Sequence, residues 1–430
     1  QDGAHRRGSR VASVDIGAVA GRAGTGAGAA GRLRACDGGA LPAAGVVGAL
    51  ATTPRMCTPA HRPRGAMALN MSAHATDLPL NPHSPPRSRR SLWRPRQCLQ
   101  RLVRSAITWA AIGASFGAPA ATLDLAGYSD ASGAITVQHG GDTVDPYFAL
   151  QALLLAHSHG LDISVPAKAW GAWLLPRQKP DATFDRFCRN GPVWAACKTA
   201  DADDSQLGLW LAFMDTLPAA QRSQAAWVRS RTATSAALAK LVDPGKGIYL
   251  VSPVYQHGLL MDNLELWEYA FTHRAAESAR HPSFTKTLAS VFWDGQRKRF
   301  LVSTQPGQRD TTHAFYPDAV AQIFPLLVRF PLIPGGARAH YRRWMEEHRT
   351  EWLAQVKGDF AWGLVAIVAL QQNDIPSARC WLQTALPHRH SAHWTVTDEV
   401  AAQILQARAI TPAPETTACT APSNSSHPAS

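Results

Sequence analysis

Residues 203–214 have the sequence DDSQLGLWLAFM, in which two acids precede a run that is almost entirely apolar. A run of this kind, without a polar face, predicts a helix surrounded by other protein. Five further segments share the pattern of an acid near the start followed by apolar residues: 144–156 (VDPYFALQALLLA), 261–271 (MDNLELWEYAF), 316–327 (YPDAVAQIFPLL), 358–370 (GDFAWGLVAIVAL) and 396–407 (VTDEVAAQILQA). These six segments decide the fold.

More polar helical segments alternate with the apolar ones, for example ARAHYRRWMEEHRTEW at 337–352. Alternating apolar and amphipathic helices predict a ring of five to six hairpins, with the apolar helices inside. We therefore expect an all-α fold, an (α/α)6-type toroid of about eleven helices. Its few short strands are expected in loops, at 134–139, 247–252 and 299–304. An irregular bundle or an open solenoid would also explain the pattern, and both stay open.

The net positive charge of the chain comes entirely from its first 120 residues. They contain sixteen Arg, no Lys and four acids, whereas the remainder contains 27 basic and 27 acidic residues. A nucleic-acid partner for the body therefore has no electrostatic support. Residues 1–66 are rich in Ala, Gly and Arg without periodicity, so we expect a disordered or non-native upstream segment there.

Residues 67–120 have the pattern of an export signal. A basic region at 87–104 precedes the apolar stretch 106–117, and Ala118-Pro119-Ala120 forms an A-x-A cleavage site. We expect cleavage after Ala120 and a periplasmic or secreted protein, which contacts a membrane only if the signal is retained. The toroid domain would then span 121–410, followed by a disordered Pro/Ser/Thr-rich tail at 411–430.

Two cysteines indicate the same compartment. Cys188 and Cys197 flank a short loop and can form a disulfide where conditions are oxidising. Their spacing fits no zinc pattern. Three histidines at 388, 390 and 393 lie in a short link and are interpreted as solvated polar residues. We therefore predict no metal and no cofactor.

The acids at the helix starts are the candidate catalytic groups. A carboxylate at a helix start is ordinarily a cap, but in a ring of hairpins all these starts would emerge on one face. Cleaving a glycosidic bond requires a protonated carboxyl group at the leaving oxygen, and a carboxylate that activates water or attacks the sugar. The candidate acid and base residues are Asp145, Asp203, Asp204, Asp262 and Glu265.

Two of these groups have informative spacings. The three carboxylates at 201, 203 and 204 should repel one another and raise the pKa of at least one. Asp262 and Glu265 lie three residues apart on one helix face, a spacing that a capping box explains equally well. Sugars stack on aromatic rings, so the aromatic residues near the predicted mouth are candidate substrate contacts: Tyr147, Trp194, Tyr255, Tyr316 and Trp394.

The chain resembles the six-hairpin (α/α) toroid glycosidases in its order of inner and outer helices. Residues 200–203 (ADAD) resemble the S-D-A-D segment of family-8 glycoside hydrolases. The resemblance implies that Asp201 and Asp203 contact the sugar at the point of cleavage. The S-E-G general-acid motif of that family is absent, and GDTVD at 141–145 precedes the first inner helix instead.

The working hypothesis is an exported glycan-active hydrolase that acts on a polysaccharide or oligosaccharide. Two alternatives stay open. One is an exported helical domain that binds glycan or protein without catalysis. The other is suggested by residues 201–204 (DADD), which resemble the D-x-D-D proton-donor motif of class II terpene cyclases, enzymes that also have (α/α) ring folds.

Overall fold

The computed structural model describes residues 120–273, 281–306 and 314–419, and these residues are mostly helical. None of the described helices combines the length and apolarity that a membrane span requires. The described residues form twelve α-helices: α2 (Pro146–Ser158), α3 (Ser164–Leu174), α4 (Asp203–Thr216), α5 (Ala219–Arg222), α6 (Ala225–Lys240), α7 (Leu260–His273), α8 (His281–Phe292), α9 (Val320–Leu327), α10 (Ala337–Ala354), α11 (Gly363–Gln371), α12 (Ile375–Ala385) and α13 (Val396–Ala407).

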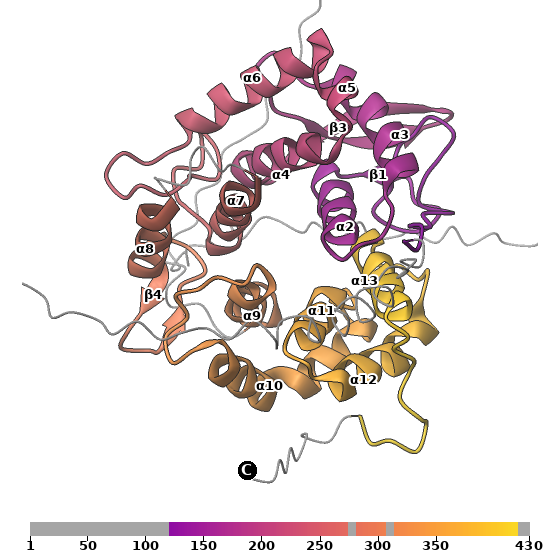
Figure 1. Cartoon of the computed structure of the whole chain (residues 1–430), viewed down its shortest axis with the longest axis vertical. Helices are drawn as coiled ribbons and strands as arrows, with labels where there is room; N and C mark the ends of the chain where they lie inside the picture. The colour runs from indigo at the N-terminus through magenta and orange to yellow at the C-terminus, as the bar shows by residue number, and fades with distance from the viewer. Residues whose placement is uncertain (1–119, 274–280, 307–313, 420–430) are drawn as a thin grey trace, which may run out of the picture. The chain divides into compact units, whose positions relative to one another are not determined.

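Six of these helices form a closed circuit of contacts. In order around the circuit they are α2, α4, α7, α9, α11 and α13, and α13 packs against α2 again. Figure 1 shows these six helices around the middle of the helical body. They are the six segments that the sequence marks as apolar.

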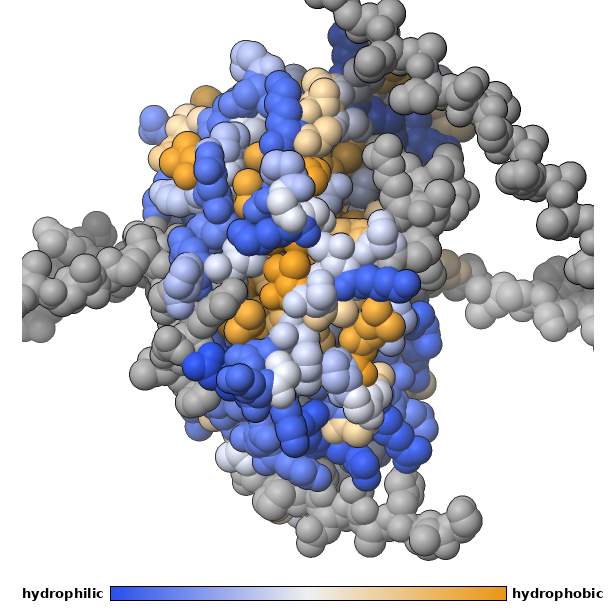
Figure 2. Space-filling view, turned by 90° about the vertical axis from the view of Figure 1, so that its left-hand side faces the viewer, coloured by the Kyte–Doolittle hydropathy of each residue, from blue (hydrophilic) through white to orange (hydrophobic). Residues whose placement is uncertain are grey.

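The remaining long helices, α3, α6, α8, α10 and α12, lie outside this circuit (Figure 1). Every residue of α4 from Asp204 to Met214 is buried, whereas α6 buries Trp227, Ser230, Thr234 and Leu238 along one face. The view from the α8 side shows a mostly hydrophilic surface with apolar residues in small separate groups (Figure 2). The predicted mainly helical fold is confirmed, and α4 and α6 differ in burial as an apolar and an amphipathic helix should.

The strands differ from the prediction. The antiparallel sheet β1–β2–β3 consists of Thr143–Val144, Asp185–Asn190 and Val193–Thr199, and β4 (Trp293–Asp294) pairs with β5 (Arg299–Phe300). The strands predicted at 134–139 and 247–252 are wrong, since those stretches form only isolated bridges. The strand predicted at 299–304 is reduced to β5. A β-branched stretch forms a strand only where a partner runs beside it.

The predicted loop between Cys188 and Cys197 is instead the β2–β3 hairpin. Its turn includes Gly191 with a φ of +60°, a conformation that glycine adopts without strain. A disulfide joins Cys188 to Cys197, as predicted. The disulfide crosslinks the two strands near the turn.

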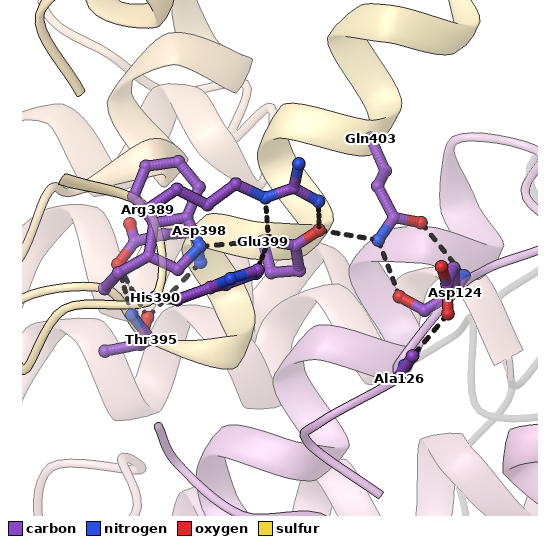
Figure 3. A network of polar contacts seen from close by, with 9 residues as sticks. Asp124, Ala126, Arg389, His390, Thr395, Asp398, Glu399 and Gln403 are labelled. Atoms are coloured by element: carbon purple, nitrogen blue, oxygen red, sulfur yellow. Dashed lines mark hydrogen bonds and ion pairs between the residues drawn. The ribbon is translucent and has the colours of Figure 1, made fainter. Parts of the chain in front are cut away.

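A polar network fastens the segment before α2 to the last helix (Figure 3). The Gln403 side chain donates to the Asp124 carbonyl at 2.6 Å and accepts from the Asp124 N–H at 3.0 Å. It also donates to Glu399 at 2.9 Å, and Glu399 accepts from the Arg389 guanidinium at 2.9 Å. This network supports the closure of the circuit at α13 and α2.

The prediction of a disordered tail from residue 411 is wrong as far as residue 419. Cys419 is buried and forms a disulfide with Cys380 of α12. The Ala413 N–H donates to the Arg379 carbonyl, also on α12. Residues 420–430 lie outside the described residues, as do the predicted upstream segment 1–66 and the predicted signal up to residue 119.

Candidate active site

The inner helices begin beside one another at one end of the circuit. Tyr147 at the start of α2 donates to Glu265 in the second turn of α7, at 2.8 Å. Asp204 in the first turn of α4 lies within hydrogen-bonding reach of Asp262 in the first turn of α7. The structure thus brings together three of the five predicted catalytic acids, Asp204, Asp262 and Glu265.

Asp204 and Asp262 form a pair of carboxyl groups in direct contact. Asp204 is fully buried, and only the backbone N–H of Ser205 opposes the rise of its pKa. Burial raises the pKa of both groups, and the charge of Asp262 raises that of Asp204 further. Two ionised carboxylates repel each other at this range, so the pair holds a proton.

Glu265 is the third member of this carboxyl cluster. Its Oε1 accepts hydrogen bonds from the Tyr147 hydroxyl at 2.8 Å and from the Gln151 amide at 3.1 Å. Burial, followed by the charge of Asp262, raises the pKa of Glu265 to about 8, although both hydrogen bonds oppose the shift. Glu265 is therefore mostly protonated at neutral pH. Oε1 already accepts two hydrogen bonds, so the proton of the neutral carboxyl group is best placed on Oε2. This oxygen is buried and has no hydrogen-bond partner among the described residues.

Asp145 lies beside the cluster but is held by an arginine. It caps α2 by accepting from the Tyr147 N–H at 3.0 Å, and it pairs with Arg186 of β2 at 2.7 Å. Arg186 also pairs with Asp201, the predicted sugar contact. Burial raises the pKa of Asp145, while Arg186 opposes that shift. Because Arg186 neutralises its charge and its side chain caps α2, Asp145 has a structural role rather than that of a catalytic acid or base.

Asp203 does not join the cluster. Its charged neighbours are Lys179, Asp181 and Asp185, which lie before and within β2. Consecutive residues of an α-helix point roughly 100° apart, so the side chain after Asp203 reaches α7 while Asp203 itself does not. Asp203 is therefore separate from the pair that Asp204 forms with Asp262.

One aromatic pair flanks the cluster. Tyr316 is 39% exposed, and its ring stacks on that of Trp362 with 5.3 Å between centroids. Burial raises the pKa of Tyr316, and the charges of Asp262 and Asp201 raise it further, so Tyr316 lies within electrostatic range of these acids. The predicted contact Tyr316 is thus well placed for a ligand.

The other aromatic candidates lie elsewhere. Trp194 is 8% exposed and donates to Asp130 at 2.7 Å. Trp394 is fully buried and stacks on Trp381 in the core. Neither ring offers a free face, so both predicted substrate contacts are wrong. Tyr255 is exposed (58%) in the segment before α7.

Two more acids at helix starts accept hydrogen bonds from backbone N–H groups. Asp398 accepts from the Gly363 N–H at 2.7 Å and from the Thr395 hydroxyl at 2.8 Å, so it caps both α11 and α13. Asp318 accepts from the Ala314 N–H at 3.2 Å. For these two acids the ordinary capping role explains their position.

A cavity of about 790 Å³ extends from the cluster between the inner helices. Its apolar lining includes Leu154, Leu209, Ala212, Phe324, Leu327 and Leu364, and its polar lining includes His157, Ser158, His159, Lys286, Arg329 and Gln371. Glu265 of the carboxyl cluster lines it as well, as does Gln151, which donates a hydrogen bond to Glu265. Further along α7, Glu268 lines the cavity, and burial raises its pKa to about 7. We call this space the axial cavity.

Sequence reasoning missed three residues of the site: Arg186, Gln151 and Trp362. Gln151 lies four residues after Tyr147, so both face Glu265 from one side of α2. A polar residue one turn after Tyr147 in an otherwise apolar helix could have predicted that Gln151 belongs to the site. Arg186 and Trp362 have no motif around them, and only the packing of β2 and the start of α11 places them here.

The described residues contain no group of three or more His, Cys, Asp or Glu side chains arranged to hold a metal ion. The chain matches no protein-family model, and a search of curated proteins finds no match either. The site must therefore be interpreted from its own geometry. That geometry is a pair of neighbouring aspartates next to Glu265, all with raised pKa values, with an aromatic pair nearby and a cavity beside Glu265.

Proposed function

We propose that the protein hydrolyses glycosidic bonds at the carboxyl cluster. The observation that carries this proposal is the contact between Asp204 and Asp262 beside the separately held Glu265. Glycoside hydrolysis needs two carboxyl functions in different protonation states, several ångströms apart. Asp204 and Asp262 touch, so they act as one function, and Glu265 is the other. Tyr316 and Trp362 would provide a stacking surface for a sugar ring.

The proposed reaction needs no other group. One function donates a proton to the glycosidic oxygen as the bond from that oxygen to the anomeric carbon breaks. The other accepts a proton from the water that attacks the anomeric carbon, or attacks that carbon itself before water replaces it. Either route ends with a free sugar and a protonated leaving group, and solvent restores the two carboxyl functions.

The fold supports the same proposal by analogy. We propose that the closed circuit of inner helices with its outer partners is a six-hairpin (α/α) toroid, similar to that of toroid glycosidases. Such an analogy raises the expectation of a glycosidase without identifying a substrate. The two disulfides support an oxidising compartment, and thereby the proposed export.

A second candidate is acid-initiated cyclisation, as in class II terpene cyclases. The apolar wall of the axial cavity and the buried Asp204 favour it. It ranks second because Asp204, the residue within the D-x-D-D segment that the structure buries, is not among the residues that line the cavity.

The test is turnover by the full chain on β-1,4-glucan, chitosan and a bacterial exopolysaccharide, measured as new reducing ends. Asp204→Asn and Glu265→Gln should each lower turnover at least about 100-fold, since each removes a proton-transfer group. Asp215→Asn is the matched control, because Asp215 lies at the other end of α4 and pairs with Arg231. Turnover that survives both cluster substitutions would contradict the proposal. Product from a prenyl diphosphate, with none from any glycan, would favour the second candidate.

A further inference from the structure

The axial cavity opens at the end of the circuit that is opposite to the carboxyl cluster. Because the inner helices begin beside one another at the cluster, they also end beside one another. Three of these ends line the cavity, through Ser158 of α2, Arg329 just after α9 and Gln371 of α11. Ser158 and Arg329 are exposed. The cavity therefore reaches solvent here, and we call this the open end of the axial cavity.

The lining changes from polar to apolar away from the open end. The polar groups at the open end are His157, Ser158, His159, Lys286, Arg329 and Gln371. Further along the inner helices the lining is carbon, from Leu155, Leu209, Ala212, Phe324 and Leu364. At the far end lie Gln151 and Glu265, and the Gln151 amide donates to Glu265 at 3.1 Å. A volume of about 790 Å³ with one polar end suits an amphipathic small molecule.

The open end carries more positive than negative charge. Lys286 of α8 and Arg329 are exposed, and neither forms a salt bridge within the described residues. Burial lowers the pKa of His159, and the charges of Arg408 and Arg329 lower it further, as expected at a positive potential. Burial raises the pKa of Glu268 to about 7, against the charge of Arg329. Glu268 is therefore only partly ionised at neutral pH and does not balance both cations.

The ends of the inner helices oppose these cations only in part. The last carbonyl groups of a helix carry a partial negative charge. Here the Leu155 carbonyl accepts a hydrogen bond from the Ser158 hydroxyl at 3.0 Å, and the Leu327 carbonyl accepts one from the Gln371 amide at 3.1 Å. Because these carbonyl groups are already paired, the open end favours an anion.

We propose that the axial cavity binds a single-chain amphiphile with an anionic head group, such as a medium-chain fatty acid. Arg329 and Lys286 bind the carboxylate at the open end, and the alkyl chain lies in the apolar interior. A guanidinium group matches a carboxylate with two parallel hydrogen bonds. This site goes beyond the proposed hydrolysis and does not depend on it, because neither head-group contact belongs to the carboxyl cluster.

The experiment titrates the full chain with decanoate below its micellar concentration and measures binding by calorimetry. Decanol and decyltrimethylammonium have the same chain and serve as the neutral and cationic probes. Decanoate should bind at least about tenfold more tightly than either, because only its head group pairs with both cations. Arg329→Gln and Lys286→Gln should each weaken decanoate binding about threefold and leave decanol binding unchanged. Lys240→Gln, at an exposed position of α6, is the control for the loss of one positive charge.

Substitutions in the cavity test where the alkyl chain lies. Ala212→Phe fills the interior and should abolish binding of decanoate and decanol alike. Leu332→Trp narrows the cavity at an exposed position (42%), in case Ala212→Phe does not fold. Val165→Trp on α3, outside the cavity and 74% exposed, is the control.

The outcomes separate the proposed site from its alternatives. A preference for decanoate that the Arg329 and Lys286 substitutions reduce, with binding lost on filling the cavity, supports the proposal. Equal affinity for decanoate and decanol, or tighter binding of decyltrimethylammonium, would overturn the anionic head group. Absence of binding by all three probes, or decanoate binding that the cavity substitutions leave unchanged, would overturn the site itself.

Discussion

At the residue scale, the contact between Asp204 and Asp262 opposes folding. Burying a carboxyl group costs free energy unless it is neutralised or well hydrogen-bonded. Two such groups face each other here, next to Glu265, and Arg186 neutralises Asp145 and Asp201 rather than this pair. Violations of this kind concentrate at functional sites, where chemistry outweighs stability.

The stability of the protein should therefore depend on pH through Glu265. Its pKa is raised from an ordinary value of 4.5 to about 8, so the folded state holds a proton that the unfolded state releases. The stabilisation is complete below pH 4.5 and is lost as the pH rises through 8. The unfolding free energy should therefore fall as the pH rises from 5 to 8, and Glu265→Gln should make this fall shallower by up to about 1.4 kcal/mol per pH unit. Urea unfolding at several pH values measures it.

An exposed acid provides the control for this measurement. Hydrogen bonds from Ser164 lower the pKa of Asp162, so its contribution is present above pH 3.8 and is lost only as the solution becomes more acidic. Asp162→Asn should therefore give a curve parallel to that of the unsubstituted protein between pH 5 and 8. Parallel curves for Glu265→Gln as well would show that Glu265 titrates normally.

At the element scale, the site depends on the close approach of α4 and α7. A Cβ atom at Gly208 would lie 2.4 Å from Cδ2 of Leu266. Gly208 is one turn beyond Asp204, and Leu266 is one turn beyond Asp262. The absent side chain thus lets the two helices approach so that the two carboxyl groups meet.

Gly208→Val should overpack this contact and lower the unfolding free energy by about 1–3 kcal/mol, measured by urea unfolding. Leu266→Ala in the same chain should restore part of the loss, so the two changes should not be additive. Ala236→Val, at an exposed position of α6, is the control for valine in a helix. Additive effects of the two substitutions would mean that Gly208 and Leu266 do not limit the approach of α4 and α7.

The helices could be predicted because each carries its own periodic or apolar pattern, as in 203–214. The β2–β3 hairpin was missed although Asn190-Gly191 is a turn signal, because β2 buries only Phe187 and β3 buries only Trp194, so neither strand alternates between buried and exposed residues. Acids at helix starts predicted Asp204, Asp262 and Glu265. The same rule also selected Asp203, because a pattern along the chain does not say which of two adjacent side chains faces the neighbouring helix.

At the scale of the whole molecule, the two disulfides close loops of different length. Cys380 and Cys419 are 39 residues apart, and Cys188 and Cys197 are nine apart. The longer crosslink removes more entropy from the unfolded chain, so it should stabilise more, by about 4 kcal/mol against about 2.5 kcal/mol.

The paired substitutions Cys380→Ser/Cys419→Ser and Cys188→Ser/Cys197→Ser test this order by urea unfolding. The first pair should lower the unfolding free energy more than the second. The reverse order would mean that the hairpin contributes to the fold beyond its loop length, for instance through Arg186 and its two partners.

The contact between α13 and α2 also bears on chain order. Because α2 and α13 each have two inner neighbours, no inner helix occupies an end of the assembly. A circularly permuted polypeptide, opened at the turn formed by Gly335 and Gly336 and linked across its former ends, would retain all six inner interfaces. The contacts between the inner helices therefore do not depend on which helical hairpin comes first in the chain.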